Sequence, residues 1–447
     1  MNENIRRASG FTLIGALAFI APMFETAAGL PFALVALLSV VITSGPVFNL
    51  LARPGDYDAG RLRGLFGFSL SAAVLGTLAG AGEMPMAVFT GTIFLVALGN
   101  LGAVISQTII KRINPTFGYI GGALIGGILG VLIPMWTFKI TTFAAPVVVT
   151  LTLSGALLAA LIHSMLFSRD EPPVIFSVGL LLWLLTAVGI DADLVAISVA
   201  VLITFTLGTL AYYFDAASVE GMIAGVLLGL LAIVLGGYNW FAVLFAFFAI
   251  GGISSKFRYE RKLQHGVAEK NQGARGGENV LANASVGMGA LFFYALTEAG
   301  AISGDALLYV FAFAGAIATA LSDTLASEIG GSYGRTRLIT TLKPVEPGTD
   351  GGITWQGMLA GIVGATIIAG LAYYTFPAVA SWEALVIVTA GVAGMVIDSL
   401  LGATVEGQVL GNGSVNFLAT FSGAIIAAIL VVAVGTAELP PLPALDN

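Results

Sequence analysis

Apolar runs of about 20 residues, separated by short polar stretches, recur along the whole chain of 447 residues. Hydrophobic residues make up 57% of the sequence and charged residues only 10%, and the mean hydropathy is +0.98. Soluble domains carry about 25% charged residues. An apolar run of about 20 residues is long enough to cross a bilayer as a helix. We therefore predict an all-α, polytopic transmembrane protein.

The apolar runs predict about fifteen membrane spans, each close to the length that a bilayer requires. The first, at residues 10–24, and the ninth, at residues 221–236, are short for a span. The predicted spans are residues 10–24, 30–52, 64–82, 85–108, 117–136, 143–167, 173–190, 193–214, 221–236, 238–256, 279–297, 305–322, 354–376, 383–403 and 414–435.

Glycine recurs at helical spacing in two of these spans. Every fourth residue from Gly118 to Gly130 is glycine, and Gly221, Gly225 and Gly229 repeat the spacing in a later span. This spacing puts the glycines on one helix face, where a neighbouring helix can approach closely. We predict that these faces pack against other helices rather than line a pore.

The basic residues predict the orientation of the spans. With a cytoplasmic N-terminus, every Lys and Arg except Lys139 falls in a cytoplasmic segment, which is the usual bias of membrane proteins. We therefore predict an integral protein of the cell membrane with its N-terminus in the cytoplasm. Because the basic residues flank spans and form no extended patch, no nucleic-acid partner is expected.

A charged turn with two prolines at residues 168–173 (SRDEPP) is predicted to separate two membrane regions. Residues 1–170 would form a six-span module to which the sequence assigns no role. Residues 171–436 would form the functional domain, followed by an acidic, Pro-rich tail at 437–447. The absence of cysteine excludes disulfides and thiolate metal sites, and two histidines are too few for a histidine-based metal site.

Four polar stretches stand out in the second region, and all map to the cytoplasmic side of this topology. The first is RGGENVLAN, in which a basic loop leads into a helix from Arg275 to Asn283. Loop charge and an ordinary helix start account for Arg275 and Glu278, with Asn279 in the first helical turn. Asn283 would enter the hydrocarbon, so it needs a polar partner.

The second stretch, SDTLASEIG, ends an apolar span with two acidic residues, Asp323 and Glu328. Asp323 and Ser327 are four residues apart and share one helix face. Carboxylates at the end of a span are costly, and their short side chains reach the interface poorly. We therefore predict a functional role for this stretch.

The third stretch is the loop from Arg335 to Gly352, which combines basic residues, acidic residues and a Gly-Thr-Asp-Gly-Gly turn. Lysine and arginine bind phosphate, and a glycine turn can present backbone N–H groups to an anion. Mg²⁺ favours one or two carboxylates together with phosphate oxygens. The combination predicts a Mg²⁺–polyphosphate site.

The fourth stretch, DSLLGATVEGQVLGNGSVN, begins with Asp398, Gly402 and Glu406 along one helical stripe. On a continuous helix the two acids would lie about 12 Å apart, too far to share one ion. Gly402 leaves room for another group to approach between them. Asn416 could cap the last span or contact a ligand. No Walker A, protein-kinase, GxSxG or HExxH sequence occurs.

Together with RLITTLKPVEPGTDGG and SVNFLAT, these motifs resemble an integral membrane family that includes the phytyl-phosphate kinase of vitamin E and phylloquinone salvage. The resemblance covers about residues 182–433. A more distant pattern runs from Asp323 to Thr349 and is similar to the nucleotide motif of CTP-dependent dolichol and phytol kinases and of CDP-diacylglycerol synthases.

These resemblances imply roles for individual residues. The implied catalytic residues are Asp323, Arg335, Lys343 and Asp398. The implied Mg²⁺ ligands are Asp323, Glu328, Asp398 and Glu406. The implied contacts to CTP or ATP are Arg275, Asn279, Asn283, Ser327, Gly330, Gly334, Arg337, Glu346, Gly348, Thr349, Gly351 and Asn416.

The resulting hypothesis is a kinase that transfers the γ-phosphate of CTP or ATP to an isoprenyl monophosphate in the membrane, at a cytoplasmic site. Its lipid tail would stay in the hydrocarbon while its phosphate reaches the site. Two alternatives remain open at this point. One is a CTP-dependent polyprenol kinase or a cytidylyltransferase that forms a CDP-lipid. The other is a transporter, although transporters place ionisable residues near the middle of the membrane.

Overall fold

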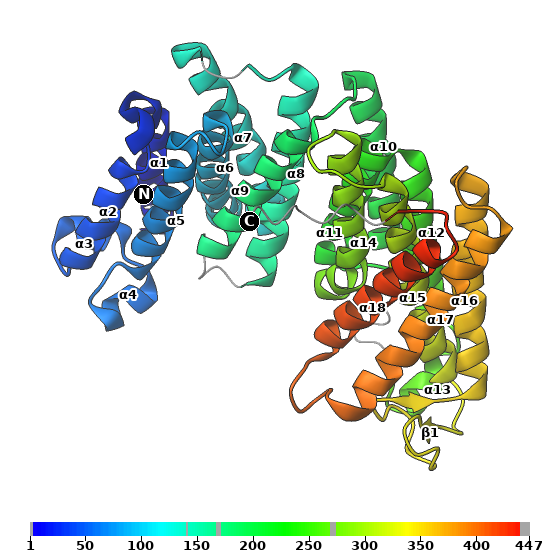
Figure 1. The fold of residues 1–447 in the computed structure, drawn as a ribbon. Helices are drawn as coiled ribbons and strands as arrows, with labels where there is room; N and C mark the ends of the chain where they lie inside the picture. The colour runs from blue at the N-terminus through cyan, green and yellow to red at the C-terminus, as the bar shows by residue number, and fades with distance from the viewer. Residues whose placement is uncertain (1–2, 140–141, 167–170, 269–273, 439–447) are drawn as a thin grey trace, which may run out of the picture. The chain divides into compact units, whose positions relative to one another are not determined.

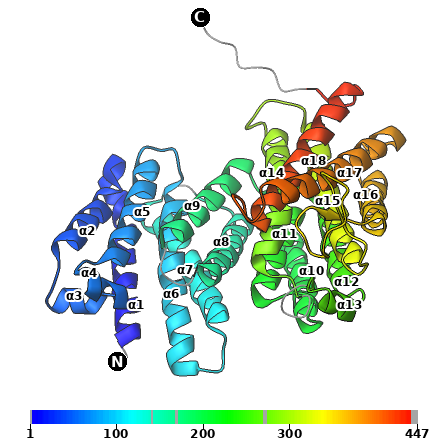
Figure 2. The ribbon, with the colours of Figure 1, turned by 90° about the horizontal axis from the view of Figure 1, so that it is seen from below.

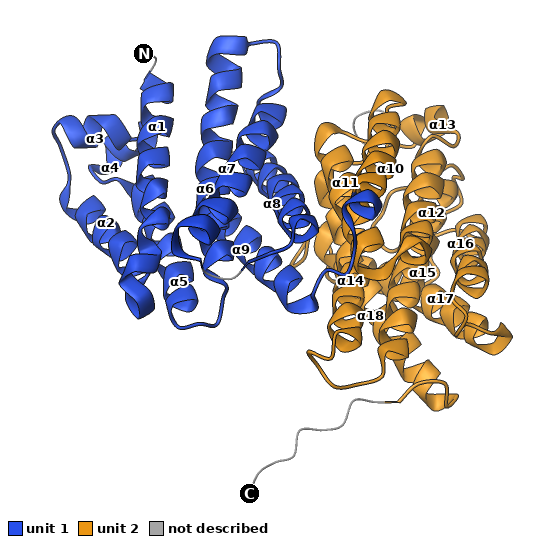
Figure 3. Ribbon diagram, turned by 90° about the horizontal axis from the view of Figure 1, so that it is seen from above, with its two compact units in different colours: residues 1–197 blue, residues 198–447 orange. Residues whose placement is uncertain are grey.

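The computed structural model describes residues 3–139, 142–166, 171–268 and 274–438. The chain forms two compact units, residues 1–197 and 198–447 (Figure 3). The predicted boundary at 168–173 lies partly outside the described residues, and the division falls later because α9 packs on α5, α6 and α8 of the first unit. Arg169, Lys270 and the predicted tail beyond Glu438 also lie outside them.

The first unit is a helical array in which α6 packs along α7 (Figure 1). Its elements are α1 Glu3–Gly15, η1 Ala16–Phe19, η2 Ala21–Ala27, α2 Leu30–Val41, α3 Pro46–Leu51, α4 Pro54–Ala59, α5 Arg63–Gly80, α6 Met86–Ile105, η3 Ser106–Ile110, α7 Pro115–Phe138, α8 Ala145–Met165 and α9 Glu171–Val188.

The predicted glycine face of α7 is confirmed as a packing surface. A Cβ atom on Gly122 would lie 2.1 Å from the carbonyl oxygen of Leu98 on α6. A Cβ on Gly126 would lie 2.4 Å from the carbonyl oxygen of Phe94. Because glycine carries no side chain here, the two backbones can come into direct contact.

Thirteen described helices are long and apolar enough to span a membrane, or up to fourteen if one bent helix pair counts as a span. This agrees with the estimate of about fifteen to within two spans, and the differences lie near the N-terminus. The first predicted span is bent by 63°, and α2 contains only 12 residues. Pro22 lies at the start of η2, the second helix of the bent pair. After α2, Gly45 and Pro46 begin the short helix α3.

The second unit is built around α15, which packs against α12, α14, α16, α17 and α18 (Figures 1 and 2). Its helices are α10 Leu194–Tyr213, whose first turn belongs to the first unit, α11 Val219–Gly236, α12 Tyr238–Ser255, α13 Tyr259–Gln264, α14 Gly277–Glu298, α15 Ala306–Gly330, α16 Trp355–Thr375, α17 Ser381–Thr404 and α18 Asn412–Ala433. A small antiparallel pair, β1 Arg337–Leu338 and β2 Gly352–Ile353, closes the loop between α15 and α16.

Small residues allow α15 to sit at this centre. A Cβ on Gly394 of α17 would lie 2.2 Å from the Thr319 hydroxyl oxygen. A Cβ on Gly423 of α18 would lie 2.0 Å from the same oxygen. Both helices therefore approach α15 closely, and this approach brings the polar end of α17 to the polar end of α15.

Candidate functional site

The first feature of the site is a pair of carboxyl groups in hydrogen-bonding contact, Asp323 on α15 and Asp398 on α17. Both residues are half-buried, and the Oδ1 atom of Asp398 is buried with no hydrogen-bond partner among the described residues. Two charged carboxylates in contact repel each other, so a proton or a cation must stabilise the pair. The sequence indicated both residues but did not indicate that they meet.

This donor set suits Mg²⁺ bound together with phosphate oxygens, because Mg²⁺ commonly takes one or two carboxylates from the protein. Among the described residues, no three Asp, Glu, His or Cys side chains form a group able to hold a metal ion. The four acids implied as ligands therefore do not converge on one centre. Asp323 and Asp398 alone are in contact within that set.

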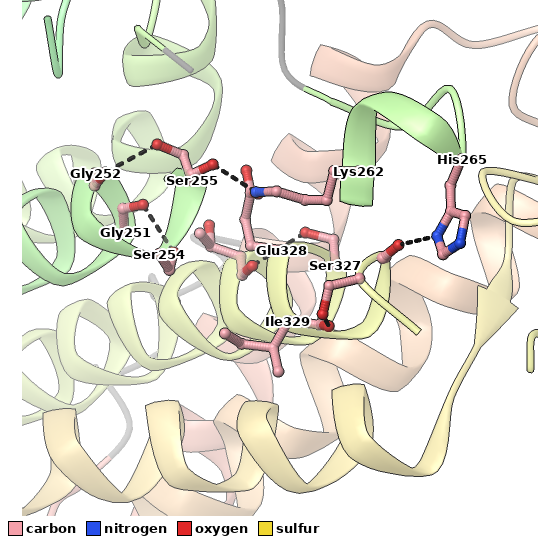
Figure 4. Close-up of polar contacts among 12 residues, drawn as sticks. Gly251, Gly252, Ser254, Ser255, Lys262, His265, Ser327, Glu328 and Ile329 are labelled. Atoms are coloured by element: carbon pink, nitrogen blue, oxygen red, sulfur yellow. Dashed lines mark hydrogen bonds and ion pairs between the residues drawn. The ribbon is translucent and has the colours of Figure 1, made fainter. Parts of the chain in front are cut away.

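Glu328 has a different partner from the one expected, because its carboxylate forms an ion pair with Lys262 of α13 (Figure 4). The Lys262 side chain is only 1% exposed, and its Nζ atom also donates to the carbonyl oxygen of Ser255. A buried ammonium needs this carboxylate to balance its charge. In the structure Glu328 is an ion-pair partner of Lys262, and its role as a metal ligand, implied by the resemblance, stays a prediction. In the sequence, Lys262 is one of several basic residues in a loop and has no feature that distinguishes it.

The same short helix also fixes the chain just beyond α15. The Nδ1 atom of His265 lies 3.0 Å from the carbonyl oxygen of Gly331 (Figure 4). The guanidinium of Arg258 stacks over the ring of Tyr333, 5.1 Å from its centroid. These contacts hold the start of the polar loop against α13.

Arg275 is buried beside the carboxyl pair. Its Nη2 atom donates to the hydroxyl oxygen of Thr324 at 3.4 Å, and its charge interacts with Asp323. The guanidinium also stacks over the ring of Phe247 on α12. Gly251 makes room for it, since a Cβ there would lie 2.6 Å from Nη2. Arg275 therefore places a positive charge at the end of the α15 span.

The asparagines and Ser327 make mainly local contacts. The Nδ2 atom of Asn283 donates to the carbonyl oxygen of Asn279 at 2.9 Å, which provides the polar partner that the sequence required. Ser327 is exposed and donates to the carbonyl oxygen of Thr324. Asn416 is buried in α18, whose N-cap is Gly411, so Asn416 is not the cap.

The loop between α15 and α16 packs against the end of α17 at Gly351. This residue has a φ of +73°, and a Cβ on it would lie 2.4 Å from the Cβ of Ala403. A Cβ on Gly402 would in turn lie 2.9 Å from the backbone nitrogen of Gly351. The group that approaches Gly402 is therefore the loop itself.

Most of the charged loop residues face outward. Arg335, Lys343 and Glu346 are exposed, while Arg337 donates to the carbonyl oxygen of Leu342 at 2.7 Å. The other loop positions implied as nucleotide contacts lie in the same segment: Gly330 at the end of α15, Gly334, Gly348 and Thr349. The loop presents three exposed cationic side chains, those of Arg335, Arg337 and Lys343, on a backbone that is held at both ends.

Glu406 follows α17 and lies near Asp350 of the loop. Burial raises the pKa of its carboxyl, a hydrogen bond with Asn412 lowers the pKa, and the charge of Asp350 raises it further. Its closest interactions are therefore with the loop and with the start of α18. Its charge also acts on Asp323 and Asp398, and its implied role as a metal ligand or an orienting residue stays a prediction.

Comparison with known proteins agrees with this membrane architecture. Residues 202–424 match the family described as "Integral membrane protein DUF92". The uncharacterized membrane protein MJ0933 of Methanocaldococcus jannaschii is 34% identical over 247 residues, an alignment that covers 53% of this chain and 95% of that protein.

Two plant proteins are also similar. Protein VTE6, chloroplastic, of Arabidopsis thaliana is 31% identical over 234 residues, which covers 51% of this chain and 69% of that protein. Protein PGR of the same plant is 32% identical over 227 residues, which covers 46% of this chain and 78% of that protein. No solved structure matches the chain. The chain belongs to the DUF92 family of integral membrane proteins.

Proposed function

We propose that the second unit is a kinase that transfers the γ-phosphate of CTP or ATP to an isoprenyl monophosphate, such as phytyl or geranylgeranyl phosphate. The observation that carries the proposal is the contact of Asp323 with Asp398 beside the buried Arg275. Two carboxylates and an arginine at the end of membrane helices suit a metal-bound polyphosphate and a lipid phosphate. The similarity to VTE6 and the resemblance to the phytyl-phosphate kinase family support the same function.

In the proposed reaction, an oxygen of the acceptor monophosphate attacks the γ-phosphorus of the nucleotide. A new P–O bond forms as the bond from the γ-phosphorus to the β–γ bridging oxygen breaks. The nucleoside diphosphate leaves with that electron pair, and the acceptor becomes a diphosphate. The attacking oxygen is already ionised, so catalysis depends on positioning and on neutralising charge rather than on a strong base.

Each charged group has a defined task in this proposal. Asp323 and Asp398 would hold Mg²⁺, which when bound neutralises phosphate charge. Arg275 would bind the phosphate oxygens of the lipid acceptor at the membrane edge. Arg335 and Lys343, which are exposed on the loop, would bind the nucleotide phosphates.

The membrane position of the site also supports a lipid substrate. The carboxyl pair lies toward the end of α15, so a lipid phosphate could reach it while the hydrocarbon chain stays within the bilayer. The distribution of basic residues supports a cytoplasmic location for the site, where nucleotides are present.

The direct test is a transfer assay with the full-length protein in liposomes, Mg²⁺ and γ-labelled CTP or ATP. The acceptors are phytyl phosphate, geranylgeranyl phosphate and the free alcohols. The proposal requires label in a prenyl diphosphate and its loss in Asp323→Asn. Label only in a monophosphate would instead identify a polyprenol kinase, and formation of a CDP-lipid would identify a cytidylyltransferase. No transfer by folded protein would contradict all three activities and favour transport.

A further inference from the structure

An apolar groove lies within the second unit between α10, α11 and α12. It is partly open and has a free volume of about 90 Å³. Its walls are mostly aliphatic and aromatic side chains, including Met222, Leu244 and Phe248. One lining residue is charged, and that residue is Arg275.

Arg275 connects this groove to the carboxyl pair. Its backbone packs on the start of α11, where a Cβ on Gly221 would lie 2.1 Å from the Arg275 carbonyl oxygen. Its guanidinium continues to Thr324 and interacts with Asp323. One end of the groove is therefore next to the proposed site of phosphate transfer.

We propose that this groove holds the hydrocarbon chain of the acceptor lipid, with the lipid phosphate at Arg275. This inference rests on the proposed function for the identity of the head group. The guanidinium of Arg275 lies beside the groove, against Phe247 and Thr324, where it is placed to bind the anionic end of a molecule whose apolar chain fills the groove. The groove would therefore orient the acceptor so that its phosphate points toward Asp323.

The outer wall of the groove suits a ligand that arrives from the bilayer. Helix α10 is the least buried of the spans, and its Leu202 and Phe205 side chains are 66% and 58% exposed. A chain could therefore reach the groove from the lipid beside α10 without crossing the packed centre around α15. Gly221, Gly225 and Gly229 line the groove over about 12 Å of α11. Gly221 and Gly229 make the close contacts predicted for this face, whereas a Cβ on Gly225 would meet no atom within 4 Å.

Gly225 offers a clean way to fill the groove. It lies midway along the glycine-lined stretch, and a Cβ placed on it meets no atom within 4 Å. Gly225→Phe therefore puts an aromatic ring into the groove without a backbone clash. Gly370 of α16 also has no atom within 4 Å of such a Cβ and does not line the groove, so Gly370→Phe is the matched control.

The first experiment measures binding without nucleotide. A geranylgeranyl phosphate carrying a photoactivatable diazirine on its chain is crosslinked to the full-length protein in liposomes, and labelled peptides are mapped. We expect labelling of α10, α11 and α12 that falls about tenfold in Gly225→Phe, as when the contacts of roughly two methylene groups are lost, and stays unchanged in Gly370→Phe. Equal labelling of both variants, or labelling of other helices, would overturn the inference.

The second experiment separates the groove from the kinase. In the transfer assay, Gly225→Phe should raise KM for geranylgeranyl phosphate about tenfold. It should raise KM for the much shorter dimethylallyl phosphate far less, and a folding defect would not produce this difference between the two substrates. Groove-specific crosslinking without any phosphate transfer would support the lipid site and reject the kinase. Transfer with normal kinetics in Gly225→Phe would support the kinase and reject the groove.

Discussion

At the residue scale, the contact between Asp323 and Asp398 makes a specific prediction. Asn keeps the size of Asp but loses the charge that would hold a cation. We expect Asp398→Asn to lower the rate of phosphate transfer by about 10²–10³-fold, as when one electrostatic stabiliser is removed. Thermal stability in detergent should stay the same or rise, because the repulsion between two carboxylates is relieved.

The control for this prediction is Ser399→Ala, which changes the next residue along α17. It should leave both activity and stability close to those of the natural protein. Full activity in Asp398→Asn would exclude this residue from the catalytic site.

The ion pair between Lys262 and Glu328 makes a second residue-scale prediction. Removing one partner leaves a buried charge, so Glu328→Gln and Lys262→Met should each cost about 3–5 kcal/mol in the free energy of unfolding. The double variant Lys262→Met/Glu328→Leu should recover most of that loss, because apolar replacements often substitute well for a buried pair. Denaturation in detergent measures all three variants.

Activity separates the two roles of Glu328. If Glu328 is only an ion-pair partner, the double variant should transfer phosphate at nearly the natural rate. If Glu328 is a metal ligand, the double variant should be stable but inactive, and that result would support the role implied by the sequence resemblance.

At the element scale, the loop between α15 and α16 depends on Gly351. An alanine there would need the unfavourable positive φ of +73° and would overlap Ala403. We expect Gly351→Ala to cost about 1–3 kcal/mol locally and to displace the loop from α17. Phosphate transfer should fall, and limited proteolysis within residues 331–354 should become faster.

Gly411→Ala is a suitable comparison for this variant. Gly411 is exposed, has a φ of −87°, and has no atom within 4 Å of an added Cβ. It should behave like the natural protein. If the protease cut Gly351→Ala no faster than Gly411→Ala, the position of the loop would not depend on the contact between Gly351 and Ala403.

At the scale of the whole molecule, the second unit is expected to fold and act without the first. The relative from Methanocaldococcus jannaschii aligns over 95% of its own length with 53% of this chain, so it has no room for a first unit of this size. We expect residues 189–447 to give a monodisperse protein in detergent with phosphate-transfer activity. If residues 189–447 gave an aggregated or inactive protein, the first unit would be needed to support the structure of the site.

The spans could largely be predicted because apolar length is a local property of the chain. All thirteen span helices correspond to predicted segments, and α15 extends to Gly330, beyond its predicted end at 322. Two additional spans were predicted near the N-terminus because the apolar composition of residues 10–52 does not reveal the bend before Pro22 or the break at Gly45.

The candidate site could be predicted only in part. Its polar segments stood out because charged groups are rare in this sequence, and so Asp323, Asp398, Arg275 and the loop were found. Lys262 was missed because one lysine in a basic loop is ordinary, and only its burial against Glu328 distinguishes it.

The membrane class, most of the spans and the polar segments can be predicted from the sequence, since each depends on residues close together in the chain. Which groups meet depends on the tertiary structure. The close approach of α17 to α15 brings Asp398 to Asp323, and Gly351 seats the loop on Ala403. Spacing along a helix shows which residues share a face, whereas the partner of that face depends on how several helices pack together.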